Sequence, residues 1–95
     1  RMSPNEVEDI ACSADGVIEA VAWGIEDDEF GQLVYLAVHV DNSDIDEASL
    51  AKSYRKSMPA YMVPRRIFLL DQSMPRTANG KLDRQAIIAQ CSIER

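Results

Sequence analysis

One lysine, Lys81, stands in a setting that suits ionic chemistry. It follows Asn79 and Gly80, a dipeptide typical of tight turns because both residues tolerate a positive φ. An apolar-periodic run that starts at Leu82 predicts a helix directly after the turn. A lysine held on such a turn has lost conformational freedom before a ligand arrives. Its ammonium is therefore suited to binding phosphate or carboxylate oxygens.

Two other interpretations of the same turn need to be considered. A phosphate-binding loop of the Walker type is excluded, because that motif needs glycine where Pro75 stands and serine or threonine where Leu82 stands. A solvated lysine on an ordinary turn is the commoner use of Asn-Gly-Lys. These three residues by themselves leave a binding role and a plain turn open.

Three segments, in order along the chain, carry a resemblance to a known family. They are residues 1–8 (RMSPNEVE), 58–64 (MPAYMVP) and 75–84 (PRTANGKLDR). With these motifs the chain resembles the small, mobile C-terminal domain of the adenylate-forming enzymes. That superfamily includes acyl-CoA synthetases, nonribosomal-peptide adenylation domains and luciferase-like ligases. The similarity spans nearly the whole chain.

The resemblance implies a two-step reaction. In the family, a large N-terminal domain binds ATP, Mg²⁺ and a carboxylic acid, and the small domain closes over it in two orientations. The first closure forms an acyl-adenylate and releases pyrophosphate. The second presents the adenylate to a thiol, either of CoA or of phosphopantetheine on an acyl or peptidyl carrier protein. The implied partners are the enzyme's own N-terminal domain, the acid and one of these thiols.

The resemblance also implies roles for individual residues. Lys81 matches the catalytic lysine of adenylate formation, where a cation opposes the charge that builds on the α-phosphate. Arg1 matches an arginine that approaches the adenylate phosphate during thiol transfer in some acyl-CoA synthetases. Arg55 falls near a position that contacts the CoA nucleotide. Gly80 and Asn79 are predicted to shape the loop, Gly80 by turning without a Cβ and Asn79 by a hydrogen bond to its own turn.

Charge is divided unevenly along the chain. Residues 1–47 carry 13 acidic side chains and 1 basic one, whereas residues 48–95 carry 9 basic and 3 acidic ones, and the net charge is -6. The second half therefore predicts a local positive field that favours nucleotide phosphates or an acidic partner. The cations of this field are Lys52, Arg55, Lys56, Arg65, Arg66, Arg76, Lys81 and Arg84.

Two further function classes compete with a ligase domain. A non-catalytic docking module for an acidic acyl or peptidyl carrier protein would use the basic half without needing the Asn-Gly-Lys turn. A small ferredoxin-like nucleic-acid binder is disfavoured, because the chain is acidic overall and its strands lack paired aromatic residues. We therefore expect no nucleic acid among its partners.

Metal and membrane functions have little support in the sequence. His39 is the single histidine, Cys12 and Cys91 lie far apart, and the acidic run 26–29 lacks EF-hand spacing, so no metal site is predicted. No apolar run is long enough to span a membrane. The cysteine usage favours a reducing compartment, and we expect a cytoplasmic protein.

The apolar pattern predicts an α+β domain with a small three-stranded sheet flanked by helices, in the order α-β-β-α-β-α. A capping box that begins at Ser3 opens the first helix, and Asp44 is expected to cap the second. The first two strands are expected to pair antiparallel. The expected helices cover residues 4–14, 45–57 and 82–91, and the expected strands cover residues 17–25, 32–40 and 65–70.

The length of 95 residues fits one domain, residues 1–95. From the resemblance we expect this domain to be the C-terminal part of a longer ligase, whose N-terminal domain holds ATP and the acyl pocket. The isolated domain is then expected to be inactive. Which acid is activated, and whether CoA or a carrier protein accepts it, depends on residues outside these 95.

Overall fold

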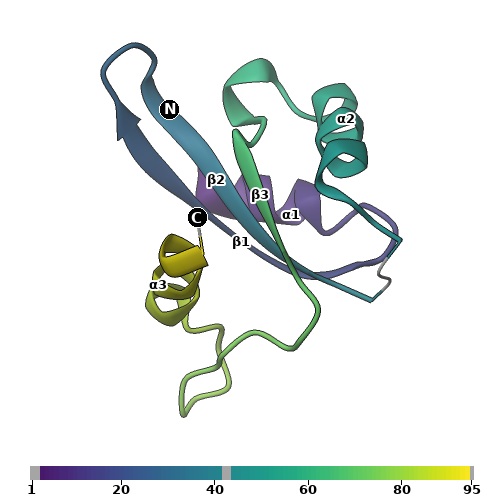
Figure 1. Ribbon diagram of the computed structural model, residues 1–95, viewed down its shortest axis with the longest axis vertical. Coiled ribbons are helices and arrows are strands. Elements are labelled where there is room, and N and C mark those ends of the chain that lie inside the picture. The colour runs from purple at the N-terminus through teal and green to yellow at the C-terminus, as the bar shows by residue number, and fades with distance from the viewer. Residues whose placement is uncertain (1–2, 42–43, 95) are drawn as a thin grey trace.

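Three strands built largely from aliphatic and aromatic residues form one mixed sheet. β1 (Val17–Asp27) pairs antiparallel with β2 (Gly31–Val40), and β2 pairs in parallel with β3 (Arg66–Leu70), so β2 is the central strand. The computed structural model describes residues 3–41 and 44–94 (Figure 1). The predicted α+β class and the antiparallel pairing of the first two strands are confirmed.

In the described part of the chain, helices cover both faces of this sheet (Figure 1). α1 (Pro4–Ala11) and α2 (Glu47–Ser57) pack on one face, and α3 (Arg84–Glu94) packs on the other. A short 3-10 helix, η1 (Ala60–Met62), adds one element to the predicted order. None of the described helices is long and apolar enough to cross a membrane.

Alternate residues along each strand contribute to two separate cores. The larger core joins the sheet to α1 and α2, and Leu50 and Tyr54 of α2 and its C-cap residue Met58 are buried in it. The smaller core joins the other face to α3 and to the segment before it. Its buried members are Val21, Ala37, Phe68, Leu70, Met74, Ile87 and Cys91.

α1 is shorter than predicted and lacks the predicted capping box. It starts where expected, but the Ser3 side chain makes no capping hydrogen bond. The helix ends at Ala11, because the Ser13 hydroxyl and amide both donate to the Ile10 carbonyl, at 2.6 and 3.0 Å. Such local side-chain bonds compete with the helical pattern and end it early.

α2 begins later than predicted, because its cap is Asp46 and not Asp44. The Asp46 Oδ1 atom accepts hydrogen bonds from the Ser49 amide at 2.7 Å and from the Ser49 hydroxyl at 2.9 Å. These bonds lower the pKa of Asp46 below its ordinary value. Glu47 does not close a capping box; its carboxylate accepts the Ile67 amide at 3.2 Å, on the outer edge of β3.

Aromatic side chains gather on the sheet, so the prediction of strands without paired aromatics is wrong. Trp23 lies opposite Tyr35 in the strand register, and the two rings lie 6.1 and 6.0 Å from the Phe68 ring. Phe68 is 7% exposed and shares the smaller core with Ile87 of α3. The central ring of the cluster is therefore buried, unlike the exposed rings on which nucleic-acid binders stack bases.

Tyr54 joins α2 to α1 inside the larger core. Its hydroxyl donates to the Ala11 carbonyl at 2.9 Å, and the residue is 1% exposed. We expect Tyr54→Phe to lower the free energy of unfolding by about 1 kcal/mol, because this hydrogen bond is lost. Urea unfolding measures the change. Tyr61→Phe, at a residue that is 58% exposed, is the control and should change stability less.

The same side chain predicts a pH dependence. Burial raises the pKa of Tyr54 to about 12, whereas a tyrosine in an unfolded chain titrates near a pKa of about 10. Burial of the neutral phenol thus stabilises the fold fully below about pH 10, and this contribution is lost as the pH rises to about 12. Over that interval the free energy of unfolding should fall more in the wild type than in Tyr54→Phe. Parallel curves for the two proteins would contradict the assignment.

Candidate functional site

A short hairpin presents Lys81 at the surface. We call residues 75–83 the Lys81 hairpin. Arg76 and Leu82 pair across it as an isolated antiparallel bridge, and the Thr77 amide donates to the Lys81 carbonyl at 2.8 Å. The lysine side chain is exposed just after the turn. The predicted turn is present, and two short paired segments hold it in place.

α3 begins at Arg84, two positions later than predicted. Leu82 belongs to the hairpin bridge and is not helical. Asp83 caps the helix, since its Oδ1 atom accepts the Ala86 amide at 3.1 Å and its carbonyl accepts the Ile87 amide at 3.0 Å. The catalytic candidate Lys81 therefore lies on the hairpin, outside the helix.

Gly80 provides the backbone conformation that the hairpin turn requires. Its φ is +85°, and its amide donates to the Thr77 carbonyl at 2.9 Å. Asn79 has no positive φ, and its side chain makes no hydrogen bond within the described part of the chain. A turn followed by a left-handed glycine is a common hairpin form. The turn thus depends on Gly80, and the hydrogen bond expected of Asn79 is not found.

Glutamates of other elements hold the two arginines on either side of the lysine. Arg76 forms an ion pair with Glu19 of β1, and Arg84 forms a two-point pair with Glu8 of α1, at 2.6 and 2.7 Å. Hydrogen bonding to Glu8 raises the pKa of the Arg84 guanidinium above its ordinary value. The Lys81 side chain makes no hydrogen bond or ion pair with any described residue. Lys81 is therefore available to an added anion.

The positive field predicted for the second half of the chain is reduced near the hairpin. Carboxylates compensate Arg76 and Arg84, and the Arg66 guanidinium lies 4.6 Å from the centre of the Phe68 ring. A separate group of basic side chains is exposed on α2. This group comprises Lys52, Arg55 and Lys56.

The predicted site residues do not come together in this domain. Arg55 lies on α2, and Figure 1 shows α2 and the segment before α3 at opposite ends of the molecule. Arg1 lies outside the described residues. Lys81 and Arg55 therefore cannot contact the same small group in this conformation, and any site that uses both needs a further domain or an extended ligand.

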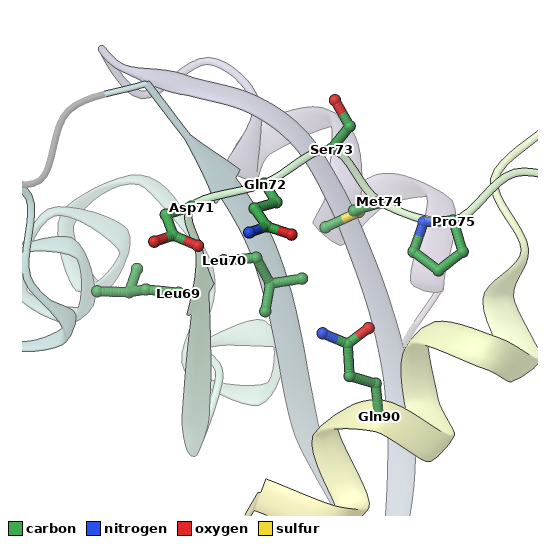
Figure 2. Close-up of a pocket in the computed structure, with 8 residues that line it drawn as sticks. All are labelled: Leu69, Leu70, Asp71, Gln72, Ser73, Met74, Pro75 and Gln90. Atoms are coloured by element: carbon green, nitrogen blue, oxygen red, sulfur yellow. The ribbon is translucent and has the colours of Figure 1, made fainter.

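A surface hollow of about 380 Å³ lies beside the start of the hairpin (Figure 2). Gln90 of α3 points toward the segment that carries Met74 and Pro75. The hollow is lined by Leu69, Leu70, Asp71, Gln72, Ser73, Met74, Pro75 and Gln90. Its charged lining group is a carboxylate and no lysine or arginine lines it, so the hollow does not suit phosphate. A phosphate bound by Lys81 would lie outside it.

No metal site emerges from the described residues, which contain no group of three or more His, Cys, Asp and Glu side chains able to hold an ion. His39 lies instead beside a carboxylate, with Nδ1 3.2 Å from the Glu19 Oε2 atom and a side chain that is 13% exposed. Cys12 is exposed at the end of α1, and Cys91 is buried in α3. His39 thus lies opposite Glu19 across β1 and β2, beside its carboxylate.

Residues 6–81 match the family described as the AMP-binding enzyme C-terminal domain. The chain belongs to this family. It is 34% identical over 88 residues to the probable CoA ligase CCL9 of Humulus lupulus, a match that covers 92% of the chain and 17% of that protein. It is 31% identical to the oxalate–CoA ligase of Arabidopsis thaliana, over 100% of the chain and 18% of that protein. The predicted family resemblance is confirmed.

Solved structures agree with this assignment. The amide bond synthetase McbA from Marinactinospora thermotolerans superposes on this AMP-binding enzyme C-terminal domain with a TM-score of 0.82 and 29% identity, over 94% of the chain and 18% of McbA. AB3403, a four-domain nonribosomal peptide synthetase solved with AMP and glycine, gives a TM-score of 0.76 and 35% identity, over 90% of the chain and 6% of AB3403. The chain thus spans less than a fifth of the length of these relatives.

The two glutamates that hold the hairpin arginines, Glu19 and Glu8, were not predicted from the sequence. A signal for Glu19 exists, because it lies two positions before Val21 along β1 and so shares the face of the strand that packs in the smaller core. A carboxylate in such a place needs a charged or hydrogen-bonding partner. The partner, Arg76, is 57 positions away, and no local pattern identifies it.

Substituting Gly80 tests the hairpin geometry. A Cβ at Gly80 would meet no atom within 4 Å, so Gly80→Ala changes the backbone preference without a clash. The left-handed conformation costs a residue with a Cβ about 1–2 kcal/mol, so hydrogen exchange of the Thr77 amide should accelerate about tenfold. Gly80→Asn should have a smaller effect, because asparagine adopts this conformation more readily.

The chain provides a matched control in the β1–β2 turn. Gly31 has a φ of +81° and equally open surroundings, so Gly31→Ala introduces the same strain elsewhere. It should leave exchange at Thr77 unchanged. Equal acceleration at Thr77 in the Gly31 and Gly80 variants would mean that the effect is global, and the local assignment would be wrong.

Proposed function

We propose that this domain supplies Lys81 to adenylate formation in an AMP-forming acid–thiol ligase. One observation carries the proposal: Lys81 is exposed on a restrained hairpin with no partner among the described residues, while carboxylates neutralise its neighbours Arg76 and Arg84. An ammonium in this position can meet an incoming phosphate without first leaving another anion. Membership of the AMP-binding enzyme family supports phosphate as that anion.

The chemistry explains why a cation is needed. A carboxylate oxygen attacks the α-phosphorus of ATP, the bond to pyrophosphate breaks, and the acyl-adenylate remains. Two anions must approach each other, and negative charge grows on the phosphate oxygens during the reaction. A positioned ammonium lowers the cost of both effects, and it does so best when it needs no reorganisation.

The remaining parts of the reaction are assigned to a larger domain. We propose that ATP, Mg²⁺ and the carboxylic acid bind there, since the described residues of this chain provide no carboxylate cluster for a metal. The thiol acceptor is CoA or the pantetheine of a carrier protein, and related proteins include CoA ligases and nonribosomal peptide synthetases. Substrates such as ATP and CoA agree with a cytoplasmic location.

We further propose that the domain changes orientation between the two half-reactions. The hairpin faces the phosphate during adenylation, and another surface faces the thiol afterwards. Arg55 on exposed α2 would then contact the CoA nucleotide, and Arg1 would approach the adenylate phosphate. The separation of α2 from the hairpin favours this division of roles, because one closure could not use both surfaces at the same small group (Figure 1).

Lys81→Ala tests the function in the complete ligase. The rate of adenylate formation, measured by ATP–pyrophosphate exchange, should fall on the order of 10²-fold. This is the scale expected when one preorganised electrostatic group is lost. Thiol transfer from preformed adenylate should change far less. Lys52→Ala, which removes an exposed lysine from α2, is the charge-matched control and should leave pyrophosphate exchange unchanged.

Three results of this experiment are informative. Selective loss of adenylation supports the assignment of Lys81. Equal losses in both half-reactions would indicate a general defect of the domain, and undiminished adenylation would exclude Lys81 as the catalytic cation.

A docking module for an acidic carrier protein is the alternative, and the exposed basic group on α2 favours it. In that case Lys52→Ala, Arg55→Ala and Lys56→Ala should weaken binding of a carrier protein to the isolated 95-residue chain, and added salt should weaken it further. Lys81→Ala should not affect this binding. Calorimetric titration with an acyl carrier protein separates the two functions, since a pure adenylation domain need not bind the carrier detectably on its own.

A further inference from the structure

Two largely buried glutamates connect the Lys81 hairpin to the rest of the domain. Glu19 is 10% exposed and pairs with Arg76 near the start of the hairpin, and Glu8 is 12% exposed and pairs with Arg84 directly after it. The arginines are each nearly half exposed, at 49% and 46%. The less exposed glutamates thus belong to the body of the domain, whereas the arginines belong to the Lys81 hairpin and to the start of α3.

The Glu19 carboxylate is shared by three elements. Its Oε1 atom accepts from Arg76, and its Oε2 atom accepts the Met74 amide at 3.4 Å and lies 3.2 Å from His39 Nδ1 on β2. Met74 itself is 3% exposed in the smaller core. The carboxylate therefore joins β1, β2 and the chain just before the hairpin at one partly buried point.

Arg76 links Glu19 to Gly80, the residue before Lys81. One guanidinium nitrogen, Nη2, donates to Glu19, and the other, Nη1, donates to the Gly80 carbonyl at 3.0 Å. The Gly80 carbonyl belongs to the peptide bond that leads into Lys81. A planar guanidinium can make both bonds at once, whereas a lysine ammonium presents a single point of charge.

Glu8 fixes the other end of the hairpin in a similar way. Its carboxylate binds both terminal nitrogens of Arg84, at 2.6 and 2.7 Å, and its Oε2 atom also accepts the Ala22 amide on the outer edge of β1, at 2.8 Å. Arg84 is the first residue of α3. The helix end that follows the hairpin is thereby held to α1 and β1 together.

We propose that Glu19 and Glu8 are positioning residues for Lys81, which they hold through Arg76 and Arg84. This inference rests on the proposed function of Lys81 in adenylation. A cation that is already in place at the moment of reaction stabilises the transition state more than one that must be ordered first. The two glutamates provide that order from inside the domain, without touching the substrate.

A positioning role makes a different prediction from a purely structural one. If Glu19 acts through Lys81, its substitution should lower the rate of adenylation while the lysine is present. The same substitution should not lower the rate further when Lys81 is already replaced. If Glu19 stabilises only the fold, its effect should persist when Lys81 is absent. Non-additivity between the two substitutions therefore separates the roles.

The test uses the complete ligase and follows ATP–pyrophosphate exchange. Glu19→Gln and Arg76→Lys should each lower kcat for adenylation about tenfold with little change in the KM for ATP, since misplacing a catalytic group reduces rate more than ground-state binding. Glu8→Gln should show a smaller effect of the same kind. In a Lys81→Ala background, none of the three should lower the rate further.

Exposed residues provide matched controls. Glu29→Gln removes the same charge from the β1–β2 turn, and Arg65→Lys makes the same exchange of cations before β3. Neither residue belongs to the hairpin or to its glutamate contacts, and both variants should retain the wild-type rate.

A second measurement does not depend on catalysis. In the 95-residue chain, Arg76→Lys should accelerate hydrogen exchange at the Thr77, Gly80 and Asp83 amides, which bond within the hairpin, and should leave the Leu36 amide of central β2 unchanged. Acceleration at all four sites would show general destabilisation and would overturn the positioning role.

The kinetic outcomes also distinguish failure of the positioning role from failure of the proposed function of Lys81. If Lys81→Ala abolishes adenylation while Glu19→Gln and Arg76→Lys leave kcat intact, the positioning role is wrong and the catalytic lysine stands. If Glu19→Gln lowers the rate equally with and without Lys81, the positioning role is again wrong. If Lys81→Ala itself has no effect, the proposed function fails first.

Discussion

The carboxylate of Glu19 sits on a largely apolar face of the sheet, and its need for partners sets the position of the Lys81 hairpin. Burying a carboxylate without hydrogen bonds or a countercharge is costly. Arg76, the Met74 amide and His39 meet that need in this domain. Because two of these partners belong to the segment around the hairpin, satisfying the carboxylate also places the lysine. The proposed function of Lys81 would then depend on the same residue as the local stability.

The Lys81 hairpin lies next to the smaller of the two cores on the sheet. The larger core binds α1 and α2 firmly to one face, while the smaller core binds α3 and Met74 to the other. A hairpin that protrudes beside the smaller core can reach another domain without exposing the main core. This arrangement agrees with the proposed function, in which the domain presents one cation to another domain and then withdraws it.

Much of the fold could be predicted from local patterns. Alternating and continuous apolar runs predicted β1 and β2 nearly to their ends. The errors lie where side chains compete for backbone groups. Ser13 shortens α1, and Asp46 replaces Asp44 as the cap of α2. The parallel pairing of β3 depends on a long crossover, and local periodicity does not reveal it.

The site was predictable in part for the same reason. The Asn-Gly-Lys turn is a local signal that made Lys81 a candidate cation, whereas Arg84 and its partner Glu8 are 76 positions apart. The most direct test of the account is lysine-reactive labelling of the complete ligase with and without ATP and Mg²⁺, read by mass spectrometry. The account predicts that ATP slows labelling of Lys81 while Lys52 and Lys56 on α2 react as before. Equal labelling of Lys81 in both conditions would contradict the claim that this hairpin brings its lysine to the nucleotide phosphate.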